Sequence, residues 1–253
     1  MPVTLEQVGS AVVVTLNYPA ARNALGPNEA AELADAVEEA AVRRASALVL
    51  TGEGAFCSGG DLRSFAELSE AYTPQGVRKR VYGNVQRIFR GLRTAAMPTI
   101  SAVDGPAIGL GMDLALACDM RFVGPNGWMQ QGWARLGLIP AGGGAWFLEQ
   151  TAPGLMWELL ADQRRLSAAQ CQDLGLGVAV EPTARDAALD RAEFLDGMDI
   201  ESRSAYAELS RRARWPEDSY LDLCADYQSG FIGSARFRDA TAQVLRPREA
   251  SAS

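Results

Sequence analysis

Three loops that contain glycines follow short apolar segments and are the first candidates for chemistry. They cover residues 57–61 (Cys-Ser-Gly-Gly-Asp), 105–111 (Gly-Pro-Ala-Ile-Gly-Leu-Gly) and 142–144 (Gly-Gly-Gly). A glycine-rich turn that leads into a helix presents free backbone N–H groups at the positive end of that helix, which suits a phosphate or an oxyanion. Glycine also serves tight turns for purely steric reasons. Two such loops about 50 residues apart, each after a buried strand, favour a shared anion site.

One carboxylate stands beside the second loop. Asp113 follows Gly111 by two residues and is surrounded in sequence by Met112, Leu114 and Ala115. An isolated carboxylate in an apolar helix is costly to bury, which favours a functional role as a general acid or base. The alternative is structural, because the helix dipole alone favours an acidic residue in the first turn.

The composition excludes several kinds of catalysis. The chain of 253 residues contains no histidine, which removes Ser-His-Asp and Cys-His hydrolases and most catalytic zinc sites. Its one lysine, Lys79, lies between two arginines and indicates a solvated basic face. The four cysteines are widely separated and show no metal-binding or disulfide spacing. Neither a P-loop nor a dinucleotide-binding fingerprint occurs, which weakens the hypothesis of a nucleotide-binding dehydrogenase.

The charge balance also limits the partners. With 31 acidic and 24 basic residues the net charge is −7, so no basic field would attract nucleic acid or an anionic membrane. No apolar run approaches the roughly 20 residues needed to cross a bilayer, and no targeting pattern is visible. We expect a cytoplasmic protein that contacts neither nucleic acid nor membrane.

The elements that must position these loops form an α/β pattern. A helix over 27–45 lies between apolar strands over 8–16 and 47–50, which indicates a crossover with helices covering a sheet. A second unit repeats this order with a helix over 77–92, a strand over 98–103, a short apolar helix over 112–118 and a strand over 120–123. Further helices are expected over 154–161, 167–174 and 184–195, followed by two or three more. We therefore predict a β/α core over 1–195 and a helical C-terminal appendage over 196–253.

Several motifs occur in an order that resembles the crotonase (enoyl-CoA hydratase/isomerase) superfamily. They are Leu-Asn-Tyr-Pro at 16–19 with Arg-Asn-Ala-Leu at 22–25, Ala-Phe-Cys-Ser-Gly-Gly-Asp-Leu at 55–62, residues 98–109 running into 114–121, and Leu-Gly-Leu-Ile-Pro at 136–140. Each motif is weak alone, but the ordered set over about residues 5–182 is specific. The resemblance implies a β/α spiral of ββα repeats, self-association as a trimer or a dimer of trimers, and a helical appendage that supports trimerisation and covers the active site.

The resemblance also implies a ligand and the residues that bind it. The ligand is an acyl-CoA thioester, with coenzyme A as part of the substrate and no tightly bound cofactor or metal. By motif position the backbone N–H groups of Ser58 and Leu110 form the oxyanion hole, and Arg22 contacts a CoA phosphate or, alternatively, only caps a surface turn. The other expected substrate-binding residues are Cys57, Gly59, Gly60, Asp61, Gly109, Gly111, Trp133 and Gly137. For Asp61 a structural role in a turn is the favoured interpretation.

The acid/base positions depart from the family pattern. Hydratases of the family carry two glutamates; here the first falls on Asp113, which is one methylene shorter, and the second on Trp133, which exchanges no proton in neutral water. We expect Asp113 to act as a single acid/base, which favours isomerisation or C–C cleavage over simple hydration. Trp133 then serves as an aromatic wall for the acyl group or packs in the core. The alternative function is a non-catalytic acyl-CoA-binding protein of the same fold.

Overall fold

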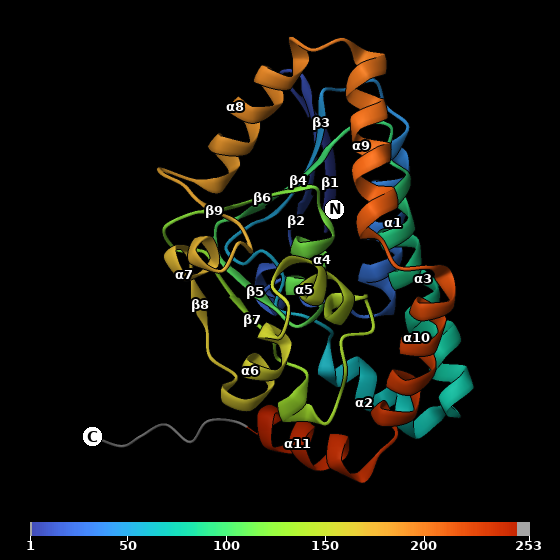
Figure 1. Cartoon of the computed structure of the whole chain (residues 1–253). Helices are drawn as coiled ribbons and strands as arrows, with labels where there is room; N and C mark the ends of the chain where they lie inside the picture. Colours follow the sequence, from blue (N-terminus) through green and yellow to red (C-terminus); the bar gives the residue numbers. More distant parts are fainter. Residues whose placement is uncertain (1, 247–253) are drawn as a thin grey trace.

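The centre of the molecule is a six-stranded sheet in the order β1-β2-β3-β4-β6-β9 (Figure 1), seen in a computed structural model that describes residues 2–246. β1 pairs antiparallel with β2, and the remaining pairs are parallel. The strands are β1 (Val3–Val8), β2 (Ala11–Leu16), β3 (Ala47–Gly52), β4 (Thr99–Val103), β6 (Met120–Val123) and β9 (Val178–Ala179). Strands β2 and β4 are buried along their whole length, as expected for a parallel sheet that is covered on both faces.

Helices cover both faces of this sheet. α1 (Pro27–Ala41) packs along α3 (Pro74–Thr94) on one face. α8 (Ala184–Asp196) covers the other face, where Ala188 and Ala192 join a second apolar cluster with Val49. Small side chains on α8 allow the helix to approach the strands closely. The α/β class predicted from the sequence is confirmed.

The short helix α4 (Leu110–Ala117) lies in the middle of the molecule, and each of its residues is buried. It is introduced by β5 (Pro106–Ile108), which belongs to a second sheet of order β5-β7-β8 with β7 (Trp128–Gln130) and β8 (Leu166–Ser167). Isolated bridges join Cys57 to Ala107 and Leu25 to Gly60. The bridge between Cys57 and Ala107 on β5 therefore brings the first and second glycine loops together.

The predicted elements are largely present, but the strands β1, β5, β7, β8 and β9 were not predicted. The expected strand over 8–16 is shorter and begins at Ala11, because Gly9 takes a positive φ of 56° and reverses the chain between β1 and β2, which form a hairpin. The helix α2 (Leu62–Ala71) was not predicted, and Phe65 is its one buried residue. The remaining helices are η1 (Pro19–Ala21), η2 (Ala134–Leu136), α5 (Gly144–Thr151), α6 (Leu155–Asp162), α7 (Ala168–Asp173), α9 (Ile200–Arg214), α10 (Asp218–Ile232) and α11 (Ala235–Leu245).

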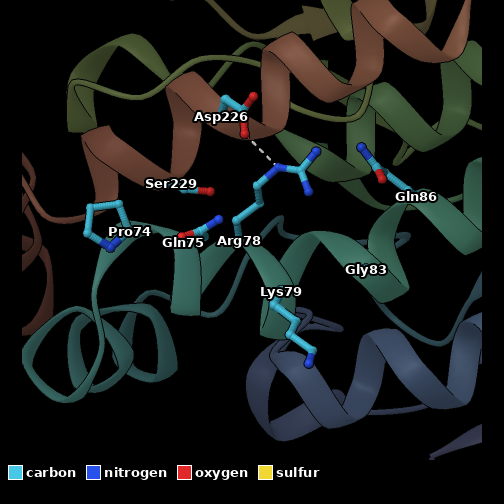
Figure 2. Close-up of a pocket in the computed structure, with 8 residues that line it drawn as sticks. All are labelled: Pro74, Gln75, Arg78, Lys79, Gly83, Gln86, Asp226 and Ser229. Atoms are coloured by element: carbon cyan, nitrogen blue, oxygen red, sulfur yellow. Dashed lines mark ion pairs between the residues drawn. The ribbon is translucent and has the colours of Figure 1, made fainter.

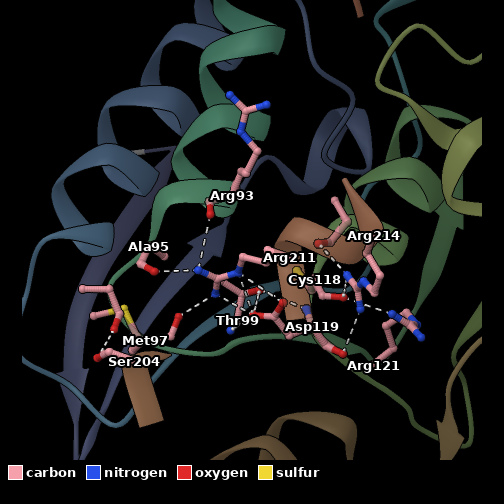
Figure 3. A network of polar contacts seen from close by, with 12 residues as sticks. Arg93, Ala95, Met97, Thr99, Cys118, Asp119, Arg121, Ser204, Arg211 and Arg214 are labelled. Carbon is pink, nitrogen blue, oxygen red and sulfur yellow. Dashed lines mark hydrogen bonds and ion pairs between the residues drawn. The ribbon is translucent and has the colours of Figure 1, made fainter. Parts of the chain in front are cut away.

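The C-terminal helices run along the body, with α10 packed against α3 and α11 contacting α2 and η2 (Figure 1). α9 is fixed by Arg211, which is buried and forms an ion pair with Asp119 at 2.6 Å (Figure 3). The same guanidinium donates to the carbonyls of Ala95 and Met97 at 2.5 and 2.6 Å. The division at residue 195 and the role of the appendage in trimerisation stay predictions, and residues 247–253 of that appendage lie outside the described residues.

Candidate functional site

The first two glycine loops lie side by side, as a shared anion site would require. The Cys57 N–H donates to the Pro106 carbonyl at 3.0 Å, and the Ile108 N–H donates to the Cys57 carbonyl at 2.9 Å. A Cβ on Gly111 would lie 2.0 Å from the Cys57 carbonyl oxygen. Glycine is therefore required at position 111 by the close approach of the two loops.

The start of α4 presents a free donor beside the first loop. Gly109 precedes the helix with a φ of 54°, and its own N–H donates to the Gln130 carbonyl at 2.9 Å. Leu110 is the first residue of the helix, and its N–H has no backbone acceptor within residues 2–246. A Cβ placed on Gly59 would lie 3.8 Å from the Leu110 nitrogen, so the two loops meet at this donor.

The expected oxyanion-hole role of Ser58 does not fit this structure. Its N–H donates to the Arg22 carbonyl at 3.0 Å and is therefore already engaged. Gly59 then reverses the chain with a φ of 105°. The next N–H, that of Gly60, has no acceptor in the described part of the chain. Gly60 is accordingly the donor on this loop that is available to a ligand.

Asp113 is a buried carboxylate without a partner. It is 4% exposed, and its Oδ2 atom has no hydrogen-bond partner among the described residues. Its Oδ1 atom lies against Gly144, where a Cβ would come within 1.8 Å of it. Burial raises the pKa of Asp113 to about 8, and the nearby N–H groups of Gly142 and Trp133 oppose this shift to a smaller extent. Burial therefore favours the neutral, protonated form of this carboxyl group.

Trp133 lies between this carboxyl group and the surface. Its ring packs over Gly109, with Cε2 3.3 Å from the position of a Cβ there, and the residue is 4% exposed. Its indole Nε1 has no partner that meets hydrogen-bond geometry within residues 2–246, although it is close enough to Asp113 to favour the ionised form. Trp133 lines a surface pocket that Asp113 does not reach. The indole therefore separates this pocket from Asp113.

This loop pocket has a volume of about 710 Å³ and is rimmed by charged side chains, among them Arg63 and Arg135. Val244 and Leu245 at the end of α11 close one side of it. Of the residues predicted to bind substrate, the pocket brings together Arg22, Ser58, Gly59, Gly60, Asp61, Gly109 and Trp133. The exposed Arg22 side chain lies at the rim, while its backbone, with a φ of 51°, is part of the turn that engages Ser58.

Four predicted site residues have other positions or contacts. Cys57 is completely buried and borders Gly111 behind the pocket. Gly137 ends η2 with a φ of 70° and faces the Arg236 side chain on α11. Asp61 lines the pocket but accepts hydrogen bonds from the Arg63 and Ser64 N–H groups at 3.2 and 3.3 Å, so its carboxylate caps α2. For Cys57, Gly111 and Gly137 the structure indicates roles in shaping the loops rather than contact with a ligand.

Two helical residues that sequence reasoning did not select also face the Asp113 region. Tyr82 on α3 and Gln228 on α10 are buried, and each has a side-chain atom without a partner within residues 2–246. No local sequence signal distinguishes them, because they are 146 residues apart and meet only when α3 and α10 pack together. Within the same range, no group of three acidic, cysteine or histidine residues could hold a metal ion, and no helix is long and apolar enough to cross a membrane.

Comparison with known proteins identifies relatives of this chain. The family model described as enoyl-CoA hydratase/isomerase matches residues 6–243. A probable enoyl-CoA hydratase of Mycobacterium tuberculosis is 36% identical over 157 residues, which cover 59% of this chain and 57% of that protein. A short-chain-enoyl-CoA hydratase of Clostridium acetobutylicum is 32% identical over 188 residues, which cover 72% of this chain and 69% of that one. The match to the first of these relatives thus spans little more than half its length.

The fold is shared with solved structures. An enoyl-CoA hydratase/isomerase from Mycobacterium paratuberculosis superposes with a TM-score of 0.87 over 96% of this chain and 98% of that chain, at 24% identity. At this identity the likeness concerns the fold. It confirms the predicted β/α architecture with helices at the C-terminal end.

Proposed function

The chain belongs to the enoyl-CoA hydratase/isomerase family, the crotonase superfamily, and from this we propose that it is an enzyme acting on a coenzyme A thioester at Asp113. The observation that carries the proposal is the pairing of a buried carboxyl group, which has no partner in the described part of the chain, with the free N–H at the start of the same helix. A buried carboxyl group whose pKa is shifted toward neutrality is typical of a functional site.

The backbone donors would stabilise negative charge on the thioester oxygen. Proton removal next to a thioester turns its carbonyl oxygen into an enolate, and fixed N–H groups aimed at that oxygen lower the barrier. We assign these donors to Leu110 and, in place of Ser58, to Gly60, because the Ser58 N–H is engaged by Arg22. The Leu110 side chain then adds apolar bulk at the entrance to the acyl site.

A single carboxyl group limits the reactions available. In its ionised form Asp113 removes a proton from the carbon next to the thioester, and the neutral acid then returns this proton to a carbon further along the chain, which moves the double bond. The same group can assist cleavage of a C–C bond that leaves the enolate. Hydration requires proton handling at both the water and the carbon, and Trp133 stands where the family resemblance places the second glutamate. Isomerisation or C–C cleavage is therefore the proposed reaction class.

A second candidate function has one observation in its favour. Trp133 separates the loop pocket from Asp113, so an acyl-CoA bound in this conformation would not reach the carboxyl group. A non-catalytic acyl-CoA-binding protein of the same fold would show this arrangement. The proposal further includes a trimer or a dimer of trimers, a cytoplasmic location, and no tightly bound cofactor.

The deciding experiment combines a binding titration with an assay of turnover. Acetyl-CoA and a longer acyl-CoA should bind in calorimetry, whereas NAD should not. Turnover of a 3-enoyl-CoA should exceed hydration of crotonyl-CoA, which we expect to be about 10²–10⁴-fold slower than in a relative with two glutamates. Binding without any turnover would favour the second candidate, and the absence of binding to every acyl-CoA would contradict both.

A further inference from the structure

The indole of Trp133 stands between the loop pocket and Asp113. Trp133 lines this pocket of about 710 Å³, whereas Asp113 lies behind the ring and does not line it. Both residues are 4% exposed. A ligand that fills the pocket therefore cannot touch the carboxyl group while the ring keeps this position.

The ring lies on a residue that has no side chain. Its Cε2 and Cζ2 atoms lie 3.3 and 3.5 Å from the position that a Cβ on Gly109 would take. Its Nε1 atom, which faces Asp113, forms no hydrogen bond of good geometry within residues 2–246. Among the described residues the ring is therefore held by apolar packing, which is not directional.

The segment around the indole, residues 131–138, is anchored on both sides. Before it, the Gln130 carbonyl accepts a hydrogen bond from the Gly109 N–H at 2.9 Å. After it, the Ile139 N–H donates to Oε1 of Gln228, a buried residue on α10, at 2.8 Å. These two hydrogen bonds fix the ends of the segment to the start of α4 and to α10.

Between these anchors the segment is hydrogen-bonded only to itself within residues 2–246. The N–H groups of Leu136 and Leu138 both donate to the Trp133 carbonyl at 3.0 Å, and the Gly137 N–H donates to the Ala134 carbonyl at 3.1 Å. Gly137 has a φ of 70°, in the region that favours glycine. The segment can therefore shift as a unit without breaking a hydrogen bond to another described segment.

A helix pair holds the second anchor in place. α10 packs along α3, and the Arg78 guanidinium on α3 forms ion pairs with Asp226 at 2.6 Å and Asp222 at 2.8 Å on α10. Figure 2 shows Arg78 directed toward Asp226 at the hollow of about 760 Å³ between the two helices. We therefore expect the segment to move relative to α10 rather than with it.

We propose that residues 131–138 form a gate, in which Trp133 covers Asp113 in the free protein and is displaced by the acyl group of a bound CoA thioester. This inference rests on the proposed function, because that function brings the acyl group to Asp113. The CoA moiety enters the loop pocket, which is open in this conformation, and the acyl group then takes the place of the indole. Until that moment the ring keeps water away from the carboxyl group.

A gate and a wall at this position predict opposite effects of removing the ring. A wall packs against the acyl group and adds affinity, so its removal weakens acyl-CoA binding. A closed gate lowers the apparent affinity in proportion to the fraction of open molecules, so its removal strengthens binding. Free CoA has no acyl group that must pass Trp133, and its affinity is therefore the internal reference.

The test compares the affinities of butyryl-CoA and free CoA by calorimetry. In Trp133→Ala the association constant of butyryl-CoA relative to that of free CoA should rise at least about fivefold over the wild type, as expected when an open conformer of about 10% becomes the main one. Trp157→Ala is the matched control, because Trp157 is 70% exposed on α6 and its removal should keep the wild-type ratio.

A second measurement keeps the test decisive if the truncation of a buried tryptophan destabilises the fold. In wild-type protein labelled with 5-fluorotryptophan, the fluorine resonance of Trp133 is identified by its absence in Trp133→Phe. Butyryl-CoA should shift this resonance, whereas free CoA should leave it in place. The resonance of Trp157 should respond to neither ligand.

A lower ratio in Trp133→Ala would make the ring a wall, and an unchanged ratio would mean that it only packs in the core. A Trp133 resonance that stays in place with bound butyryl-CoA would mean that the acyl group never displaces the ring. Each of these results overturns the gate while acyl-CoA binding stands. Failure of both ligands to bind would instead contradict the proposed function.

Discussion

The two ends of helix α4 hold buried aspartates in opposite environments. Asp113, in the first turn, is 4% exposed and has no hydrogen-bond partner for Oδ2 among residues 2–246. Asp119, just beyond the last turn, has a side chain that is 10% exposed and forms an ion pair with Arg211 at 2.6 Å. It also accepts hydrogen bonds from the N–H and hydroxyl of Thr99 at 2.8 and 3.0 Å.

This contrast separates a structural carboxylate from one that is available for chemistry. The partners of Asp119 connect the start of β4 with α9, so its charge is used to hold elements together (Figure 3). Asp113 forms no ion pair within residues 2–246, and its Oδ2 atom has no hydrogen-bond partner there, so its burial is a cost to folding. One aspartate therefore pairs with an arginine, and the other has an unpaired Oδ2 atom within residues 2–246.

The largest expected effect is on the stability of the paired end. Arg211→Met leaves Asp119 buried without its counter-ion and also removes the donor to the carbonyls of Ala95 and Met97. Breaking a buried ion pair in this way costs about 3–5 kcal/mol. Urea unfolding at pH 7 should show a loss of this size in the free energy of unfolding.

The neighbouring arginine provides the control. Arg212 lies on the same helix, its side chain is 76% exposed, and within residues 2–246 it pairs only with Glu208. Arg212→Met should therefore change the stability little. The double variant Arg211→Met with Asp119→Asn should recover part of the loss, because it removes the unpaired charge. Equal free energies of unfolding for Arg211→Met and Arg212→Met would show that the ion pair between Arg211 and Asp119 does not stabilise the fold.

The next largest effect concerns the chemistry at the unpaired end. Asp113→Asn keeps the size of the side chain but removes its exchangeable proton. Turnover of the preferred acyl-CoA should fall at least about 100-fold, the lower end for an acid/base group, which corresponds to about 3 kcal/mol. Binding of acyl-CoA should change little, since the N–H groups of Gly60 and Leu110 are untouched.

Asp119→Asn is the matched variant at the other end of the helix. It should lower the stability but leave the turnover of the folded molecules within a few fold of the wild type. Full activity in Asp113→Asn would make Asp113 a structural residue at the start of the helix. A loss of acyl-CoA binding in that variant would mean that the carboxyl group organises the loops.

The sequence predicted the sheet and the central helix well because their signals are local. The predicted β6 has the observed ends, and the predicted β3 and α4 agree with the observed ends to within about two residues, since each is mostly apolar and short. The hairpin at Gly9 was missed because valines on both sides of it read as one strand. That turn depends on one positive φ, which composition does not reveal.

The candidate site was only partly predictable for a similar reason. The sequence predicted that the first two loops share one anion site. It did not show which N–H group of the first loop has no acceptor within the protein. That depends on the φ of 105° at Gly59, which turns the chain after Ser58 and leaves Gly60 as the available donor. Tyr82 and Gln228 had no local signal at all, because their relation exists only through the packing of α3 on α10.

The smallest expected effect, when it is measured for one pH unit, is the pH dependence of stability that the unpaired carboxyl group imposes. The pKa of Asp113 is about 8 in the folded protein against an ordinary value of 3.8. Between these two values the unfolded chain binds fewer protons than the folded one, so a rise in pH favours unfolding. The contribution of this group to stability is therefore complete below about pH 4 and decreases by about 1.4 kcal/mol per pH unit on the way to pH 8.

The difference between Asp113→Asn and the wild type isolates this contribution, because all other groups titrate in both proteins. Urea unfolding between pH 5 and pH 8 should show the variant gaining stability relative to the wild type as the pH rises, with the gain levelling off above about pH 8. Asparagine carries no charge at any of these pH values, so it escapes the cost of ionisation in an apolar site. A constant difference across this range would mean that the carboxyl group of the folded protein titrates normally, and a difference of the opposite slope would mean that its anion is stabilised. Either result would remove the contrast between the two ends of α4.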